Sequence, residues 1–252
     1  MPYLHAKDVS LTFPLYSASA LSASRPDAED IPNIVKSKSG RIIGVKALSN
    51  VNFELESGDR LAIIGANGSG KTTLLQVLAG IYPPDQGYVE MHGACTNLIN
   101  INLGMQADVT GNDNIMLRGL AAGHSREQVE EQRSQITEFS QLGEFLDMPV
   151  RTYSAGMRIR LSFAIATAFK PEILLLDEWL SAGDAAFRAR AVERMNTFVS
   201  EAGILVLASH SRQLLLENCN KAIWLERGSI RALGDVETLW DAYVEDQSKL
   251  NA

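Results

Sequence analysis

One short segment, residues 65 to 72 (GANGSGKT), constrains the possible folds of this chain more than any other feature. It fits the pattern G-x-x-x-x-G-K-[ST], follows an apolar run of strand length (Leu61 to Ile64), and precedes a predicted helix (Lys71 to Ala79). Glycines allow successive backbone N–H groups to face phosphate oxygens, and the helix N-terminus adds the positive end of its dipole. We therefore expect a strand–loop–helix unit that binds a nucleoside triphosphate. The expected contacts are Gly65, Ala66, Asn67, Gly68, Ser69, Gly70, Lys71, Thr72 and Thr73.

Bulk properties limit the remaining possibilities. With 252 residues, of which 46% are hydrophobic and 21% charged, the chain can form one large domain with a sizeable core. Its net charge of −7 argues against a general nucleic-acid partner, which usually meets a basic surface. Cys95 and Cys219 lie in no metal-binding pattern and are predicted to be unpaired thiols. No apolar run approaches the roughly 20 residues of a membrane span. We therefore expect a soluble protein.

The first hundred residues read mainly as strands. A strand is predicted over Leu4 to Phe13, and residues 17 to 40, rich in Ser, Ala, Pro and charge, read as a long loop or hairpin excursion. A second strand pair is predicted at 46–55 and 60–65, with its turn at 57–59, and further strands at 87–91 and 96–101.

A helical block follows. Helical patterning covers 111–148, where Ser125 and Gln128 predict a capping box, and a third helix is predicted over 154–169. Apolar residues recur at near-helical spacing within the block: Val129, Ile136, Phe139, Leu142 and Leu146.

Strands and helices then alternate again. We expect a strand at 173–177, a helix at 185–201, a strand at 204–208, a helix at 212–218, a hairpin around 227–228, and a last helix at 236–246. Such alternation on both sides of a helical block predicts an α/β fold in which a helical subdomain, at about 103–170, is inserted into a parallel-sheet core.

Two carboxylates end the apolar run Ile173 to Leu176. Asp177 suits the Mg²⁺ partner that P-loop enzymes place at the end of a buried strand, together with the Thr72 hydroxyl. Glu178 faces differently and can orient or deprotonate an attacking water. A strand that ends in Asp-Glu is common by itself, but its position downstream of a phosphate-binding loop favours the functional interpretation.

The segment Tyr153 to Met157 (YSAGM) helps to distinguish between families of P-loop proteins, although by itself it is only a capped helix start. Ser154 is a good N-cap residue, and Ala155 and Gly156 leave backbone N–H groups open. Between a P-loop and the carboxylate strand, this segment resembles the signature motif of ABC ATPases, usually written LSGGQ. Residues 181–184 (SAGD) resemble the D-loop of that family, and His210, after the strand ILVLAS, resembles its switch histidine. A lone histidine at a strand end is more often structural, but its place in this ordered series reverses the expectation.

This resemblance covers nearly the whole chain. It implies a single ABC ATPase domain over residues 1–252, a P-loop NTPase with a RecA-like core, an antiparallel β subdomain and the inserted helical subdomain. ATP and Mg²⁺ are the implied cofactors, Glu178 and His210 the catalytic residues. It also implies a dimer with a second copy of the chain, in which ATP on one P-loop contacts the partner's signature, here Ser154, Ala155 and Gly156, and its D-loop, here Asp184.

A narrower resemblance concerns the ATPases that export O-antigen, capsule, teichoic acid and related glycans. It rests on YSAGM, on the stretch from 103–104 (LG) through 108–114 (DVTGNDN), and on 179–187 (WLSAGDAAF). The segment 13–16 (FPLY), followed by the long excursion before the P-loop, also fits. It implies a separate integral membrane permease, a lipid-linked polysaccharide as transported substrate, and a location on the cytoplasmic face of the bacterial inner membrane. The excursion at 17–40 is expected to lie toward the permease, and no C-terminal carbohydrate-binding domain is expected. The alternative is an ABC transporter ATPase for another substrate class.

Two assignments stay open. The Q-loop residue, a metal and water contact, is Asn100, Asn102 or Gln106, with Asn100 nearest the usual place. The aromatic that stacks on adenine is Phe13 or Tyr16, because the excursion breaks simple spacing.

Overall fold

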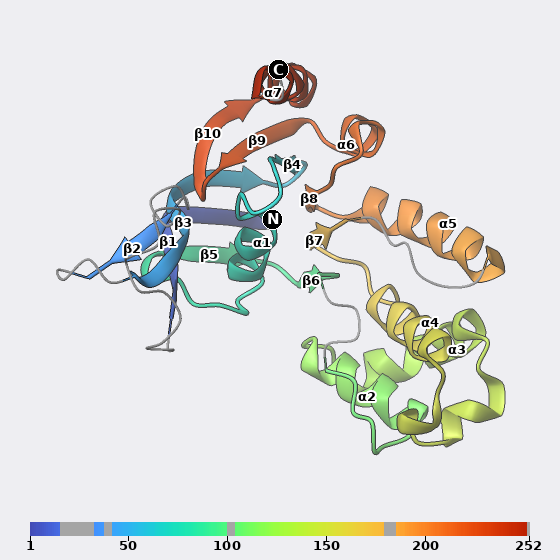
Figure 1. The fold of residues 1–252 in the computed structure, drawn as a ribbon. Helices are drawn as coiled ribbons and strands as arrows, with labels where there is room; N and C mark the ends of the chain where they lie inside the picture. Colours follow the sequence, from blue (N-terminus) through green and yellow to red (C-terminus); the bar gives the residue numbers. More distant parts are fainter. Residues whose placement is uncertain (16–32, 38–41, 100–103, 179–184, 251–252) are drawn as a thin grey trace. The chain divides into compact units, whose positions relative to one another are not determined.

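The computed structural model describes residues 1–15, 33–37, 42–99, 104–178 and 185–250 (Figure 1). The chain divides into two compact units. The first comprises Met1–Gly93 with Ile204–Ala252, and the second comprises Ala94–Gly203. The predicted helical segment lies within the second unit.

An antiparallel sheet forms one part of the first unit. Its strands are β1 (Tyr3–Pro14), β2 (Ile34–Lys36), β3 (Ile42–Glu56) and β5 (Gln86–His92), in the order β2-β3-β1-β5. Buried and exposed residues alternate along β3, as expected of strands with one covered face. Leu4 is opposite Leu55 on one side and Met91 on the other. Strand β2 falls inside the predicted excursion, so residues 34–36 of that segment belong to the sheet.

Parallel strands form the other part of the first unit. Strand β4 (Arg60–Ile64) pairs in parallel with β8 (Ile204–Ala208) and with β9 (Lys221–Glu226), and β10 (Ser229–Gly234) closes the predicted hairpin with β9. The predicted pairing of 46–55 with 60–65 is wrong, because β3 and β4 belong to different sheets. The reason is visible in their burial: β3 alternates, whereas β4 is buried almost continuously, as parallel strands are.

Three helices complete the first unit: α1 (Lys71–Leu78), α6 (Arg212–Asn218) and α7 (Val236–Leu250). Helix α1 buries Leu74, Leu75, Val77 and Leu78. Helix α7 extends four residues beyond the predicted end at Asp246, and Tyr243 on it meets Trp224 of β9 edge to face, with ring centroids 5.6 Å apart.

The second unit pairs two short parallel strands with a group of helices. Strands β6 (Cys95–Asn97) and β7 (Ile173–Asp177) are paired, and β6 is shorter than the predicted 96–101, whose last two residues lie outside the described part. The helices are α2 (Gly111–Ala121), α3 (Arg126–Ser140), α4 (Ala155–Ala166) and α5 (Ala185–Glu201), with 3₁₀ turns η2 (Gly143–Asp147) and η3 (Val150–Thr152). None of the described helices is both long and apolar enough to cross a bilayer.

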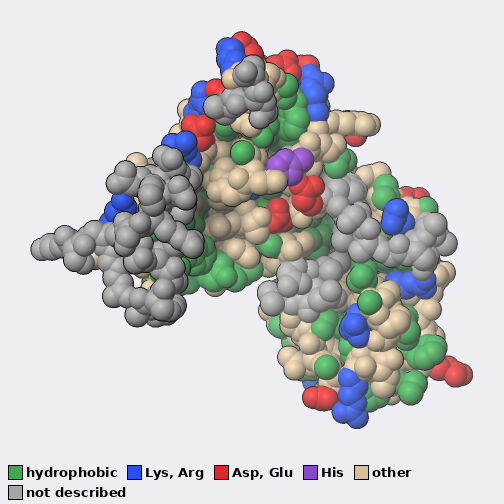
Figure 2. Space-filling view, in the orientation of Figure 1, with side chains coloured by type: hydrophobic (Ala, Val, Ile, Leu, Met, Phe, Trp, Pro, Cys, Tyr) green, Lys and Arg blue, Asp and Glu red, His purple; other side chains and the backbone are tan. Residues whose placement is uncertain are grey.

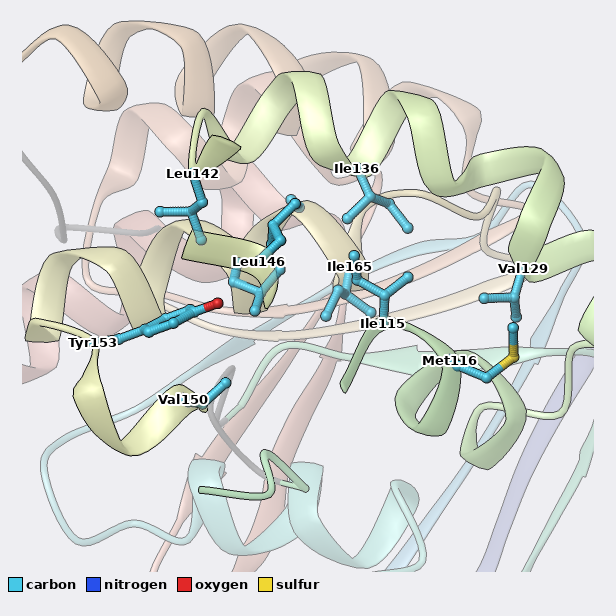
Figure 3. Close-up of a cluster of buried hydrophobic side chains, with 11 residues drawn as sticks. Ile115, Met116, Val129, Ile136, Leu142, Leu146, Val150, Tyr153 and Ile165 are labelled. Carbon is cyan, nitrogen blue, oxygen red and sulfur yellow. The ribbon is translucent and has the colours of Figure 1, made fainter. Parts of the chain in front are cut away.

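The core of the helical segment confirms the predicted periodicity. Val129, Ile136, Leu142 and Leu146 are buried, and Phe139 packs against the cluster partly buried. The predicted capping box is present, since Ser125 accepts from the backbone N–H of Gln128 and the Gln128 side chain accepts from that of Ser125. Figure 3 shows the buried side chains of this cluster, which come from several elements; the labelled ones are Ile115, Met116, Val129, Ile136, Leu142, Leu146, Val150, Tyr153 and Ile165.

On the face shown in Figure 2, the described residues of each unit carry both acidic and basic side chains.

Candidate functional site

The loop between β4 and α1 has a backbone that requires glycine. Gly65, Gly68 and Gly70 have φ values of 151°, 78° and 106°, in the region that L side chains rarely adopt. A Cβ on Gly65 would overlap the carbonyl oxygen of Leu225, and one on Gly70 would lie 2.9 Å from the carbonyl oxygen of Ala47. The loop is held from outside by a hydrogen bond of 2.8 Å from Gly228 N to Ser69 O.

The polar groups of this loop suit a bound phosphate chain. Lys71 is buried and its Nζ donates to the carbonyl oxygens of Gly65 (2.8 Å) and Ala66 (3.2 Å). The N-terminus of α1 has no side-chain cap, so no side chain accepts a hydrogen bond from its first backbone N–H groups. Ser69 is 6% exposed, and its Oγ has no hydrogen-bond partner in the described structure. Donors left open around a lysine are what a triphosphate requires.

The other predicted contacts of this segment are more open. Asn67 and Thr72 are exposed, and Thr73 is half-buried in the first turn of α1. The Thr72 hydroxyl is therefore available for a metal ion from the side of the loop.

His210 lies at the same edge of the parallel strands as this loop. Strands β4 and β8 are parallel with Ile63 opposite Ala208, so the loops that follow these two strands start at the same edge of the sheet. His210 is exposed and lies between two fixed serines. The buried Ser209 Oγ accepts from Ser211 N at 3.1 Å, and Ser211 caps α6. The histidine is thus presented to solvent from a rigid backbone.

Of the two candidate adenine contacts, Phe13 is described. It lies near the end of β1, is 37% exposed, and meets the equally exposed Tyr82 edge to face with centroids 5.4 Å apart. Tyr16 lies outside the described residues. Tyr82 had no signal in the sequence, because it follows α1 in an irregular segment that matches no motif.

The carboxylate pair lies at the end of β7 in the second unit. Residues 173–176 are buried, Asp177 is half-buried and Glu178 is exposed. Glu178 has φ 66°, which is unusual for a residue with a side chain. Residues held in such sparsely populated backbone conformations cluster at functional sites.

The signature segment forms an exposed helix start. Ser154 caps α4 by accepting from Met157 N at 3.2 Å, and Ser154 and Ala155 are exposed. The Arg158 side chain donates to Tyr153 O at 2.7 Å, which holds the backbone directly before the cap residue Ser154. A Cβ on Gly156 would meet only Ser154 Oγ, at 3.9 Å, so packing within the described chain does not require glycine at this position.

Tyr153, the residue before the cap, is hydrogen-bonded to η2 and lies against the first residue of α2. Tyr153 is 3% exposed, and its hydroxyl donates to Phe145 O at 2.6 Å. Burial raises the pKa of this tyrosine. A Cβ on Gly111 would overlap the Tyr153 hydroxyl, so the glycine at the start of α2 leaves room for the tyrosine ring.

The structure leaves the Q-loop assignment open. Asn100 and Asn102 lie outside the described residues, as does Asp184 of the predicted D-loop. Gln106 is exposed, and its backbone is held by the fully buried Asn114, whose Oδ1 accepts from Gln106 N (2.8 Å) and whose Nδ2 donates to Gln106 O (2.9 Å). In the sequence, Asn114 stands out only as part of the stretch 108–114, and no pattern there indicates its hydrogen bonds to Gln106.

The two proposed metal ligands lie in different units, Thr72 in the first and Asp177 in the second. Across the described residues, no group of three or more His, Cys, Asp and Glu side chains is arranged to hold a metal ion.

Comparisons with known proteins agree on the family. The family described as ABC transporter matches residues 48–181. The O-antigen export system ATP-binding protein RfbE of Yersinia enterocolitica is 40% identical over 91% of this chain and 97% of its own length. The teichoic acids export ATP-binding protein TagH of Bacillus anthracis is 39% identical over 81% of this chain, which spans only 37% of that protein.

Solved structures share the fold. An ATP-binding subunit of an ABC transporter superposes with a TM-score of 0.68 at 20% identity, covering 95% of this chain and 92% of that one. A dimeric ATP-binding cassette in a post-hydrolysis state, bound to ADP and Pi, gives a TM-score of 0.64 at 18% identity, covering 92% and 98%. The chain therefore belongs to the ABC transporter family and is an ATPase with the ATP-binding cassette fold.

Proposed function

We propose that this ATPase binds MgATP on the loop between β4 and α1 and hydrolyses it to drive export of a lipid-linked polysaccharide. The observation that carries the first part is the loop itself. It combines a buried lysine, an uncapped helix N-terminus and the unpartnered Ser69 Oγ. In the proposal, Lys71 exchanges its two carbonyl partners for the β- and γ-phosphates, a charge-assisted contact of greater strength.

The proposed catalytic roles follow from position. Glu178, the exposed residue directly after β7, orients and deprotonates the attacking water. His210, held between two fixed serines, contacts the γ-phosphate side of the same site. Thr72 and Asp177 would hold Mg²⁺, which would supply positive charge to neutralise the phosphates. Whether Asn100, Asn102 or Gln106 completes this set stays open, as does the choice of Phe13 or Tyr16 for adenine.

We further propose that two copies of the chain sandwich the nucleotide. The support is Gly156, which has open space around it and lies at an exposed, capped helix start. Bare N–H groups at such a start suit a phosphate approaching from another molecule. Asp184 joins this contact in the proposal. The resulting dimer works with an integral membrane permease on the cytoplasmic face of the inner membrane.

The transported substrate class is proposed from the relatives. Proteins named for O-antigen export and for teichoic acid export are 40% and 39% identical, and the first is matched over 97% of its length. We infer that this chain serves a permease for a lipid-linked cell-surface polysaccharide. The excursion at 17–40, most of which lies outside the described residues, stays a predicted contact with that permease.

Nucleotide binding is tested with Lys71→Ala. Loss of a charge-assisted contact should weaken binding of a fluorescent ATP analogue by more than about tenfold. The matched control is Lys249→Ala, which removes an exposed lysine paired with Glu245 on α7 and should leave affinity unchanged. Equal affinity in the two variants contradicts the loop assignment.

The export role is tested in the source cell. Deleting the gene should remove one surface polysaccharide and leave lipid-linked polymer inside the cell. A plasmid copy of the gene should restore the surface polymer, and a plasmid copy with Glu178→Gln should not. Surface glycan is measured by gel or by a labelled lectin. An unchanged surface glycan, with loss of another transported compound, contradicts the polysaccharide assignment and leaves the ATPase assignment intact.

A further inference from the structure

Three phenylalanines join the helix α5 to the pair α3 and α4. Phe139 comes from α3, Phe163 from α4 and Phe187 from α5, and each ring contacts the other two. Their centroids are 5.6 Å (139–163), 5.7 Å (139–187) and 6.0 Å (163–187) apart, and Phe163 and Phe187 are buried. Such tilted and edge-to-face contacts fix the three helices at one point.

Two arginines of α5 extend this junction. Arg190 and Arg194 are four residues apart and therefore lie on one face of the helix. Their guanidinium carbons lie 4.9 Å and 5.3 Å from the centre of the Phe139 ring. Both side chains thus contact the aromatic ring that comes from α3.

The arginine donors go to the ends of the neighbouring helices. Arg190 Nη2 donates to Phe139 O (3.2 Å), in the last turn of α3. Arg194 donates to Thr167 O from Nη2 (2.7 Å) and from Nε (3.2 Å), and Thr167 is the C-cap residue of α4. The last carbonyls of a helix lack partners within it and carry the negative end of the dipole, so cations stabilise them.

The space around these arginines is not filled by apolar packing. A cavity of about 420 Å³ lies between α3, the end of α4 and α5, and Arg190 and Arg194 are among its lining residues. Neither guanidinium forms an ion pair with a carboxylate in the described part of the chain. Burial lowers the pKa of Arg194, and Glu201, which lines the same cavity, acts in the opposite direction. The hydrogen bonds of both guanidinium groups go to helix carbonyls, and these contacts determine where the two side chains lie.

Their position links two elements of the proposed dimer contact. Helix α4 begins at the signature residues, and α5 begins directly after residues 179–184, the predicted D-loop. The 12 residues of α4 span about 18 Å, so a tilt of about 10° at its C-terminus moves its N-terminus by about 3 Å. A shift of that size breaks hydrogen bonds to a phosphate.

We propose that Arg190 and Arg194 are positioning residues that fasten the C-terminus of α4 to α5, so that Ser154 to Gly156, at the other end of α4, meet the nucleotide of a second copy. The inference rests on the proposed sandwich dimer. The two arginines touch no nucleotide in this scheme. They determine where the signature end of α4 lies when the second copy arrives.

The test uses Arg190→Met and Arg194→Met, which keep a long apolar stem and remove the donors. Both are made in the full chain carrying Glu178→Gln, which should hold ATP without hydrolysing it. ATP-dependent dimerisation, measured by sedimentation, should weaken about tenfold for Arg194→Met, and less for Arg190→Met, which loses one hydrogen bond instead of two. Affinity of the monomer for a fluorescent ATP analogue should stay within about twofold of the parent, because the nucleotide loop lies in the other unit.

Three comparisons make the outcome decisive. Arg126→Met removes an exposed arginine at the opposite end of α3 and should change neither quantity. Arg194→Lys keeps the positive charge but not the two hydrogen bonds to Thr167 O, and its dimerisation constant should lie between those of the parent and of Arg194→Met. If a Met variant does not fold, Arg194→Lys provides the test. Dimerisation at the parent level in a folded Arg194→Met or Arg194→Lys overturns the proposal. Absence of an ATP-dependent dimer in the Glu178→Gln parent instead contradicts the proposed function.

Discussion

At the scale of single residues, two motif glycines are kept for different physical reasons. Gly65 has positive φ and no room for a Cβ, because the carbonyl oxygen of Leu225 lies against it. Gly156 lies in the first turn of α4 with open space around it. One glycine is required by the fold of the chain itself. The other becomes necessary only if something outside the chain approaches it.

These two positions give a paired prediction. Gly65→Ala should lower the free energy of unfolding by about 2–4 kcal/mol, through backbone strain and overlap. Gly156→Ala should leave it unchanged or raise it by up to about 1 kcal/mol, because alanine favours the helix. Urea denaturation measures both. In the Glu178→Gln background, Gly156→Ala should nevertheless weaken the ATP-dependent dimer. A destabilised Gly156→Ala, or one that dimerises normally, contradicts the distinction.

The two cysteines give a prediction about pH. Both are free, as the sequence predicted, and burial raises the pKa of Cys95 and of Cys219 to about 12. A pKa raised on folding, from an ordinary value of 9.0, means that the thiol contributes stability fully below pH 9. That contribution is lost as the pH rises from 9 toward 12.

The measurement is thiol reactivity together with stability. At pH 8 both thiols should react with a disulfide reagent many times more slowly in the folded protein than in urea, since the thiolate is the reactive form. The midpoint of thermal unfolding should fall between pH 9 and 11, and a Cys95→Ser, Cys219→Ala double variant should lose part of that fall. Fast reaction of either thiol in the native protein is inconsistent with its burial.

At the scale of elements, the loop before α2 is held by one buried side chain. Asn114 is fully buried and bonds to both backbone groups of Gln106 and to Thr110 O. Asn114→Ala would remove both hydrogen bonds to the partly buried backbone of Gln106 and leave a small cavity, and should lower the free energy of unfolding by about 2–4 kcal/mol. Urea denaturation tests this. Asn52→Ala, at an exposed asparagine that accepts from Asp8 N, should cost less than about 1 kcal/mol.

The elements also show which features a sequence can reveal. The capping box at Ser125, the buried run of β7 and the alternation of β3 depend on neighbours close in the chain, and each was predictable. The partner of β3 was not, because strand pairing depends on residues far apart, and neither was the role of Asn114, which bonds to a loop without regular structure. Arg190 and Arg194 escaped prediction for the same reason, since their acceptors are carbonyls of two other helices.

At the scale of the whole molecule, the proposed machinery is divided between two units. The nucleotide loop and His210 lie in the first, and the signature start and Glu178 lie in the second. Motif order along the chain indicated these four candidates, but it did not indicate that they fall into two compact units. The signature residues Ser154 and Ala155 are exposed, and only the Ser154 hydroxyl oxygen would meet a Cβ on Gly156. We therefore expect activity to depend on a second copy.

This expectation is tested through protein concentration. If two copies form each site, specific ATPase activity at saturating ATP should rise in proportion to protein concentration below the dimerisation constant, and should then level off. Glu178→Gln should stop turnover and sediment as a dimer with ATP but as a monomer without it, because the water is no longer deprotonated and the sandwich persists. Glu178→Gln combined with Lys71→Ala should remain monomeric with ATP, since it lacks the nucleotide contact. Specific activity that is constant over a thousandfold dilution would mean that one copy holds a complete site, and turnover at the parent rate in Glu178→Gln would remove that residue as the catalytic base.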